Sequence, residues 1–166
     1  MSFVPASGDD NAGYSEFEAL TITRTGSFEL DMAPEAALPL FTAPGEKLWV
    51  PDWDPAILHG DGYEKGTVFV TTNHGSAAYW LVCDYNTDAG HAQYARVTPG
   101  MNTGTVDVSI SPGESGGTTV SVRYQLTGLS TAGNADLEES FSEASYAAMM
   151  EEWRSMILPI QFGGIM

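Results

Sequence analysis

The sequence predicts one α+β domain in which an antiparallel sheet of six or seven strands packs against a long C-terminal helix. The 166 residues are 43% apolar, 11% aromatic and only 17% charged, enough apolar material for a single core. From Gly66 onward, short apolar stretches recur between turn signals, which is typical of an antiparallel meander. The chain then ends in its only long amphipathic pattern, whose apolar stripe needs a partner surface.

The N-terminal part is expected to contain a leader and the first strand. Residues 1–17 mix Gly, Ser, Asp, Asn and Pro without an apolar period, so we expect a mobile leader before a domain at 18–166. The stretch Leu20–Met32 alternates between apolar and polar residues, as a strand does, with a bulge expected near Gly26.

Prolines and tryptophans organise the next segment. Pro34 suits the first position of a short helix, and two further prolines keep that helix from extending. A second short helix is expected over Gly45–Trp49. The loop 50–55 must be ordered, because the indoles of Trp49 and Trp53 are costly to leave in water.

Five more strands follow, separated by turns rich in Gly, Pro, Asn and Asp. The period of two is cleanest in the last two strands, which predicts one dry face and one wet face. The expected strands are Thr67–Thr72, Ala78–Tyr85, Ala92–Thr98, Thr105–Ser111 and Thr118–Leu129.

A helix is predicted over Ala135–Leu158, capped by Asn134 or Asp136. One face of this helix is mostly apolar, with small residues among large ones, which predicts space between helix and sheet. The stripe consists of Leu137, Phe141, Ser145, Ala148, Met149, Trp153 and Met156.

The charge of the chain argues against two classes of partner. Twenty-two acidic residues stand against six basic ones, for a net charge of −16. Such a field repels phosphate backbones and anionic lipid headgroups, so we expect neither nucleic acid nor membrane as a partner. A well-hydrated surface, in some proteins an adaptation to salt, is the ordinary explanation of such acidity.

Cysteine content and the N-terminus suggest a location. The lone Cys83 cannot form an internal disulfide, which favours a reducing compartment. The N-terminus lacks the charged and apolar regions of a signal peptide, and no apolar run reaches the ~18 residues of a membrane span. We expect a cytoplasmic protein without membrane insertion, as a monomer or homodimer.

The sequence contains none of the common cofactor or metal motifs. GxGxxG, P-loop and HExxH patterns are absent. His59, His74 and His91 stand in turn or Gly-flanked contexts without metal-ligand spacing, so they are interpreted as loop residues. No cofactor and no metal are expected.

The order of the elements, together with one segment, resembles a known superfamily. Residues 46–55 (EKLWVPDWDP) look like the E-x-x-W-x-P-x-W-x-P segment of START-like or SRPBCC proteins, the superfamily of polyketide cyclase/dehydrase-type and Bet v 1-like proteins with the helix-grip fold. Further similarities are residues 66–69 (GTVF) and 94–100 (YARVTPG). The resemblance covers about residues 20–158. It implies a sheet wrapped around the C-terminal helix and a mostly apolar pocket between them for a small hydrophobic molecule.

Two charged residues are candidates for chemistry in such a pocket. The helical phase of Glu152 places an acid on the interior stripe, where a carboxylate needs a partner or a proton. Arg96 could supply that partner from the sheet. The alternative is that Glu152 sits at the rim and reaches water.

Aromatic residues would provide most of the ligand contacts, although each of them could simply be core. The predicted ligand-binding residues are Trp53, Phe69, Trp80, Tyr94, Arg96, Tyr124, Phe141, Ser145, Met149, Glu152 and Trp153. A non-catalytic binding or carrier protein for a lipid-like, polyketide-like or aromatic compound is the first hypothesis. The second is a cyclase, dehydratase or hydrolase-type enzyme that uses Glu152 with Arg96 or a tyrosine.

Overall fold

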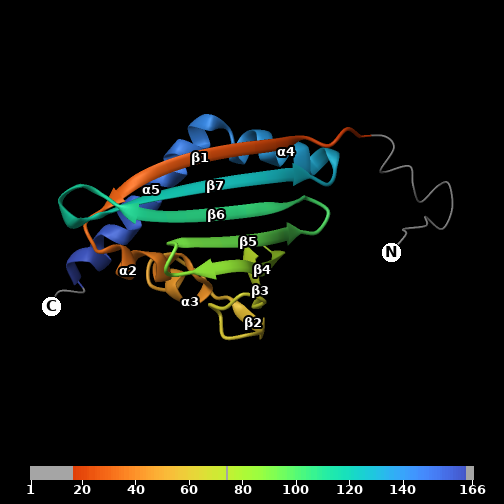
Figure 1. Ribbon diagram of the computed structural model, residues 1–166. Helices are drawn as coiled ribbons and strands as arrows, with labels where there is room; N and C mark the ends of the chain where they lie inside the picture. The colour runs from red at the N-terminus through yellow and green to blue at the C-terminus, as the bar shows by residue number, and fades with distance from the viewer. Residues whose placement is uncertain (1–16, 74, 164–166) are drawn as a thin grey trace.

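The structure, a computed structural model, describes residues 17–73 and 75–163. Its centre is one antiparallel sheet with the strand order β1-β7-β6-β5-β4-β3-β2 (Figure 1). Residues 1–16 of the predicted leader lie outside the described residues. The strands are β1 (Thr21–Leu30), β2 (Ala56–His59), β3 (Val68–Asn73), β4 (Ser76–Asn86), β5 (His91–Thr98), β6 (Asn102–Pro112) and β7 (Thr118–Gly128).

The predicted meander is confirmed, because each strand from β2 to β6 pairs with the next one along the chain. The first strand, β1, crosses over to pair with β7 along its whole length, from Thr21 opposite Thr127 to Leu30 opposite Thr118. The sheet therefore has two edges, β1 and β2.

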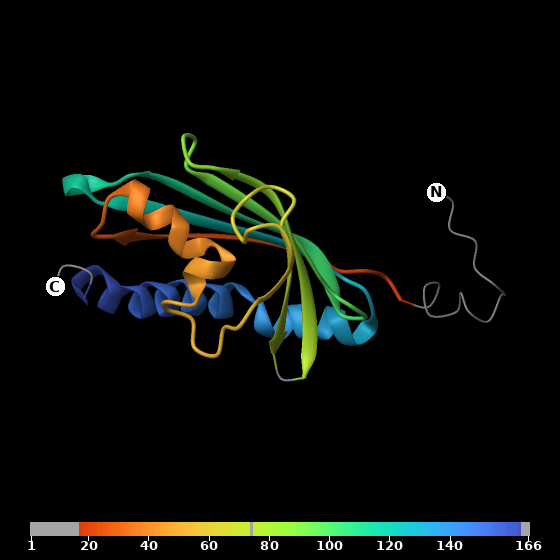
Figure 2. The same ribbon diagram turned by 90° about the horizontal axis from the view of Figure 1, so that it is seen from below.

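The two faces of the sheet differ as the period of two requires. On β7, Val120, Val122, Tyr124 and Leu126 are buried, and their neighbours in sequence point to the other face. Figure 2 shows the C-terminal helix and the short helices on the same side of the sheet, so the core lies between them and the inner face.

Two short helical segments cover the inner face between the first two strands. Helix α2 (Pro34–Ala37) continues into the 3₁₀ turn η1 (Leu38–Phe41), and α3 (Ala43–Glu46) follows. The hydroxyl of Thr42 caps α3 by accepting a hydrogen bond from the Gly45 amide at 3.0 Å.

The loop after α3 is held by its tryptophans, as predicted. Trp49 is buried, with 6% of its surface exposed, and its Nε1 donates to the Leu40 carbonyl at 2.7 Å. The half-buried Trp53 donates from Nε1 to the Ala43 carbonyl at 2.8 Å. Because each indole finds a backbone acceptor, the loop is tied to the short helices.

Two details of the strands were not predicted correctly. Strand β2 was missed, because all four of its residues are exposed and show no apolar alternation. The bulge expected near Gly26 is wrong: β1 pairs with β7 without a shift, and a bulge lies instead between Val82 and Asp84 of β4. Gly26 lacks a side chain for another reason, since a Cβ there would lie 2.7 Å from Met150 Cγ.

The C-terminal segment forms two helices, not the single predicted helix. Helix α4 (Thr131–Ser140) is separated from α5 (Glu143–Gly163) by Phe141 and Ser142. The cap of α4 is also different from the prediction, because the Ser130 hydroxyl accepts from the Gly133 amide at 2.9 Å.

The break changes which residues of α5 face the sheet. The buried positions are Tyr146, Met150 and Ile157, with Trp153 half-buried between them. A pattern extended through the break carries the wrong rotation into the second helix. Ala148 and Glu152 are therefore exposed, so the predicted interior stripe is wrong at these two positions. For Glu152 the alternative, a side chain that reaches water, is the one observed.

Candidate functional site

A small cavity lies inside the protein, between the inner face of the sheet, α3 and α5. Its volume is about 20 Å³, which is space for about one water molecule. Among the described residues, the larger space beside α5 is a surface hollow against β1 and not an interior cavity, because aromatic side chains fill the interior. The lining residues are Phe41, Glu46, Phe69, Trp80, Tyr94, Val106, Val108, Tyr124 and Trp153.

Aromatic rings surround the cavity in two groups, and both groups contribute to its lining. In the first, Phe69 and Trp80 are stacked at 5.6 Å between ring centroids, with Trp53 edge-on to both. In the second group, the ring centroid of Trp153 lies 6.4 Å from that of Tyr124 and 6.2 Å from that of Phe41. The site therefore presents flat apolar surfaces.

The cavity contains one carboxyl group, that of Glu46 at the end of α3. No hydrogen bond to this carboxyl is found within the part of the chain that the structure describes. Burial raises the pKa of Glu46 from 4.5 to about 8, since an apolar surrounding disfavours the charged form. At neutral pH, Glu46 is therefore mostly protonated and can donate a hydrogen bond.

Two tyrosines place phenol groups in the same interior. The Tyr94 hydroxyl donates to the Phe41 carbonyl at 2.8 Å, and burial together with nearby Glu46 raises the pKa of Tyr94. Burial also raises the pKa of Tyr124 to about 12, with Arg96 opposing and Glu46 assisting this rise. The Tyr124 phenol therefore lies close enough to interact electrostatically with both the Glu46 carboxyl and the Arg96 guanidinium.

Arg96 lies beside the cavity on the inner face of β5. Its guanidinium is 5.4 Å from the ring centroid of Trp80 and 6.0 Å from that of Phe141, in the arrangement of cation–π contacts. One hydrogen bond, from an Nη to Asn102 Oδ1 at 3.2 Å, holds it. Burial lowers the pKa of Arg96, but an arginine stays protonated in proteins.

The structure brings together only some of the residues expected to bind a ligand. Phe69, Trp80, Tyr94, Tyr124 and Trp153 line the cavity. Trp53, Arg96 and Phe141 lie directly behind these residues. Their role in binding stays a prediction.

Three expected residues lie away from the cavity. The hydroxyl of Ser145 donates to the Glu139 carbonyl, where the chain passes from α4 to α5. Met149 packs half-buried against the core without lining the cavity, and Glu152 is exposed. The interior acid is instead Glu46, which sequence reasoning missed. Its signal was present, since Glu46 stands one helical turn before the buried Trp49.

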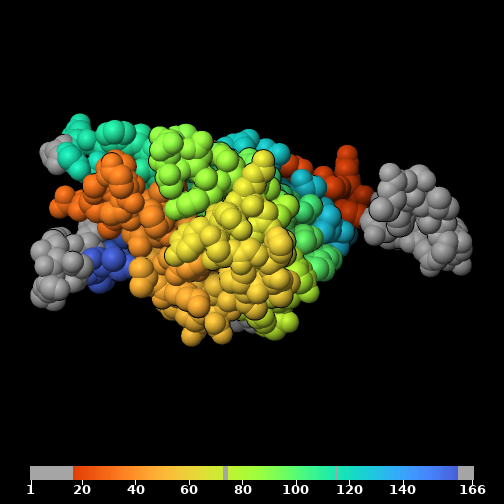
Figure 3. All heavy atoms as spheres, turned by 60° about the horizontal axis from the view of Figure 1, so that its bottom comes forward, coloured from red at the N-terminus to blue at the C-terminus, as the bar shows by residue number. Residues whose placement is uncertain are grey.

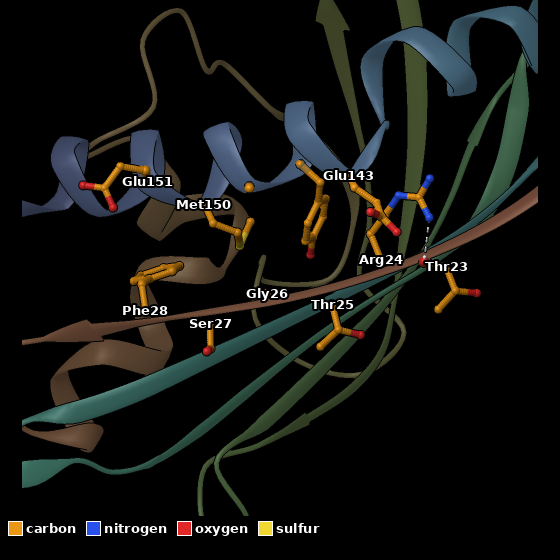
Figure 4. A pocket seen from close by; sticks show the side chains of 11 residues that line it. Thr23, Arg24, Thr25, Gly26, Ser27, Phe28, Glu143, Met150 and Glu151 are labelled. Atoms are coloured by element: carbon orange, nitrogen blue, oxygen red, sulfur yellow. Dashed lines mark hydrogen bonds between the residues drawn. The ribbon is translucent and has the colours of Figure 1, made fainter.

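Two larger hollows lie on the surface. One, of about 450 Å³, lies between β1 and α5; Figure 4 shows Met150 projecting from α5 toward Gly26. In this hollow Arg24 already donates to the Phe141 carbonyl at 2.8 Å. The other, of about 680 Å³, is a shallow depression along residues 47–54. Figure 3 shows the segment from α2 to β2, orange to yellow, as a continuous surface on that side of the molecule.

The outer face of the sheet has its own polar cluster around His91. Its Nδ1 lies 3.0 Å from Asp84 Oδ2, and its Nε2 lies 3.2 Å from Asp107 Oδ1. Partial burial lowers the pKa of His91, but the bonds to Asp84 and Asp107 outweigh this, and the pKa is raised. Among the described residues no group of three or more His, Cys, Asp or Glu is arranged to hold a metal ion.

The interior therefore brings several polar groups together among aromatic rings. It combines a protonated carboxyl, two phenols and a guanidinium with flat apolar walls. Such a set can orient a mostly apolar molecule by a few polar contacts, and a carboxyl with a raised pKa can also transfer a proton near neutral pH.

Comparison with known proteins finds similar folds without similar sequences. No family model matches the chain, and no curated protein matches it. Major latex-like protein 151 of Panax ginseng has a TM-score of 0.65 at 12% identity, over 86% of this chain and 98% of its own. Norcoclaurine synthase of Thalictrum flavum has a TM-score of 0.62 at 12% identity, over 84% of this chain and 88% of its own. Ara h 8.0201 has a TM-score of 0.60 at 13% identity, over 83% of this chain and 98% of its own.

These three neighbours are Bet v 1-like proteins. A point mutant of norcoclaurine synthase, with a TM-score of 0.64 at 12% identity over 91% of this chain and all of its own, is in complex with a transition-state analogue. At such low identity, the likeness extends to the fold and not to a reaction. Among the described residues, no helix has the length and apolarity needed to cross a membrane.

Proposed function

We propose that this chain, which has the Bet v 1-like helix-grip fold, binds a small hydrophobic molecule in its interior cavity. The observation that supports this most is the Nε of the Arg96 guanidinium, which is buried beside the aromatic rings without a hydrogen-bond partner. The half-buried Glu46 carboxyl, which lines the cavity, also makes no hydrogen bond among the described residues. Buried polar groups normally have hydrogen-bond partners, and a bound molecule would supply them. The neighbours of the same fold include a protein in complex with a transition-state analogue, which supports the same proposal.

Binding requires the interior to open, because about 20 Å³ holds no such molecule. Trp53, Trp80 and Trp153 are only half-buried. They lie at the border of the core, and we propose that they move aside together with the loop that carries Trp53. The bound state is then one that the ligand selects and stabilises.

The neutral dye N-phenyl-1-naphthylamine, whose fluorescence rises in apolar surroundings, tests this proposal. We expect saturable binding to the wild type and loss of binding in Val108→Phe, which fills the cavity. Val97→Phe makes the same change on the outer face of the neighbouring strand and should bind as the wild type does. Equal binding by both variants, or none by the wild type, would contradict the proposal. Native mass spectrometry of the purified protein checks independently whether a small molecule is retained.

A second candidate function is proton-transfer catalysis, of the cyclase or dehydratase type. The specific observation in its favour is that the pKa of Glu46 is raised to about 8 by burial, beside the phenols of Tyr94 and Tyr124. In this hypothesis the general acid or base is Glu46, not Glu152. Glu46→Gln would then keep ligand binding and lower turnover by roughly 10²- to 10⁴-fold, whereas a carrier would show no turnover to lose.

We also propose the cytoplasm as the location of this protein. The basis is the single cysteine, Cys83, which is free in the structure.

A further inference from the structure

We propose that the bound molecule carries an anionic group, such as a carboxylate, which contacts the guanidinium of Arg96. This inference rests on the proposed function and adds the chemical class of the ligand. It follows from the hydrogen bonds, the charge and the surroundings of Arg96.

Arg96 has more hydrogen-bond donors than the protein satisfies. A guanidinium has five N–H groups, and the side chain makes one hydrogen bond, to Asn102 Oδ1. Its Nε is buried without a partner, and it is the only side-chain nitrogen or oxygen with this property among the residues described. An unsatisfied buried donor costs ~1 to 3 kcal/mol, so a partner is expected in the functional state.

The charge of Arg96 is also left uncompensated. None of the ion pairs found in the described part of the chain includes Arg96; Asp136 lies within electrostatic reach but not in contact. Acidic residues are not scarce, since the chain has 22 of them. The acid of the interior, Glu46, is mostly protonated at neutral pH. The interior therefore holds a net positive charge in a protein whose total charge is −16.

The residues around Arg96 indicate what the rest of the bound molecule looks like. Trp80 and Phe141 flank the guanidinium, and Trp80 continues into the cavity lining. Arg96 itself lies behind Trp80 and does not line the cavity, so an anionic group reaches it when the interior opens at Trp80, and the rest of the molecule then lies as a flat apolar body between the rings. Because a guanidinium matches the geometry of a carboxylate, an aromatic or polycyclic carboxylic acid fits this site.

A matched pair of competitors tests the proposal. The naphthylamine dye serves as reporter, and 2-naphthoate and 2-naphthamide, which have nearly the same shape but differ in charge, displace it. Since a hydrogen bond to a charged group contributes ~1.5 to 3 kcal/mol, we expect naphthoate to act at roughly 10- to 100-fold lower concentration. Arg96→Met should remove this preference, and Arg96→Lys should keep part of it. Arg123→Gln removes the same charge from the outer face and should change nothing.

Each outcome separates the two proposals. Equal displacement by naphthoate and naphthamide in the wild type overturns the anion proposal and leaves the proposed function intact. A preference for naphthoate that persists in Arg96→Met overturns the role of Arg96. If neither compound binds, measured also by the shift in melting temperature without the dye, the anion proposal fails; if the dye does not bind either, the proposed function fails with it. Because the wild type alone gives the first comparison, the test does not depend on the folding of a variant.

Discussion

Replacing Glu46 by Gln should make this protein more stable at neutral pH, although it removes a native side chain. The Glu46 carboxyl faces an aromatic cavity without a hydrogen bond among the described residues, and burial raises its pKa to about 8 in the folded protein, against 4.5 for an ordinary Glu. Gln has nearly the same shape and carries no charge at any pH. The variant therefore removes the cost of ionising a buried acid.

The sign and size of the effect follow from proton linkage. The folded state holds the Glu46 proton more tightly than the unfolded state, so the free energy of unfolding falls as pH rises from 4.5 to about 8. Each pH unit in this window costs about 1.4 kcal/mol, which amounts to about 3 kcal/mol at pH 7. Water entering the cavity reduces this cost. We expect the free energy of unfolding of Glu46→Gln to exceed that of the wild type by about 1 to 3 kcal/mol at pH 7 and to equal it near pH 4.5.

Urea unfolding followed by tryptophan fluorescence, from pH 5 to pH 9, measures this difference. Glu35→Gln, on the exposed surface of α2, removes the same charge and should change stability by under about 0.5 kcal/mol at every pH. Carbon-detected NMR should show the Glu46 carboxyl titrating near pH 8. Parallel stability curves for the wild type and Glu46→Gln, with a carboxyl that titrates near 4.5, would refute the reasoning.

Four further substitutions test the packing and the outer face. Trp49→Ala should lower the free energy of unfolding by ~3 to 5 kcal/mol, and Trp53→Ala should lower it by less, because Trp49 is buried and Trp53 half-buried. Urea unfolding of both variants measures these losses, and equal losses would contradict this ranking. Gly26→Ala should destabilise by ~1 to 3 kcal/mol, since the added methyl group meets Met150; an unchanged melting temperature would show that Met150 moves freely. His91→Gln should lower the free energy of unfolding by under about 1 kcal/mol at pH 5 and by less at pH 8, because a histidine with a raised pKa stabilises the fold while it is protonated. A loss of stability that grows with pH would contradict this prediction.

Features that depend on neighbouring residues along the chain could be predicted from sequence. Strands β3 to β7 were found because their apolar residues alternate and turn residues separate them. The ordered loop around Trp49 and Trp53 followed from the cost of exposing indoles to water. Strand β2 could not be found this way, since its exposed residues carry no pattern.

The order of the elements, except for β2 and the break between α4 and α5, could be predicted from sequence, and so could the aromatic character of the interior, because periodicity and residue type are local properties. Which acid lines the cavity depends instead on how distant segments pack. Two residues, Phe141 and Ser142, interrupt the helix and rotate everything that follows, so Glu152 turns to solvent. Glu46 becomes an interior group because α3 folds against the inner face of the sheet, and strands far away in the sequence surround its carboxyl. Burial is a property of the surfaces that meet in space, and no local pattern contains it.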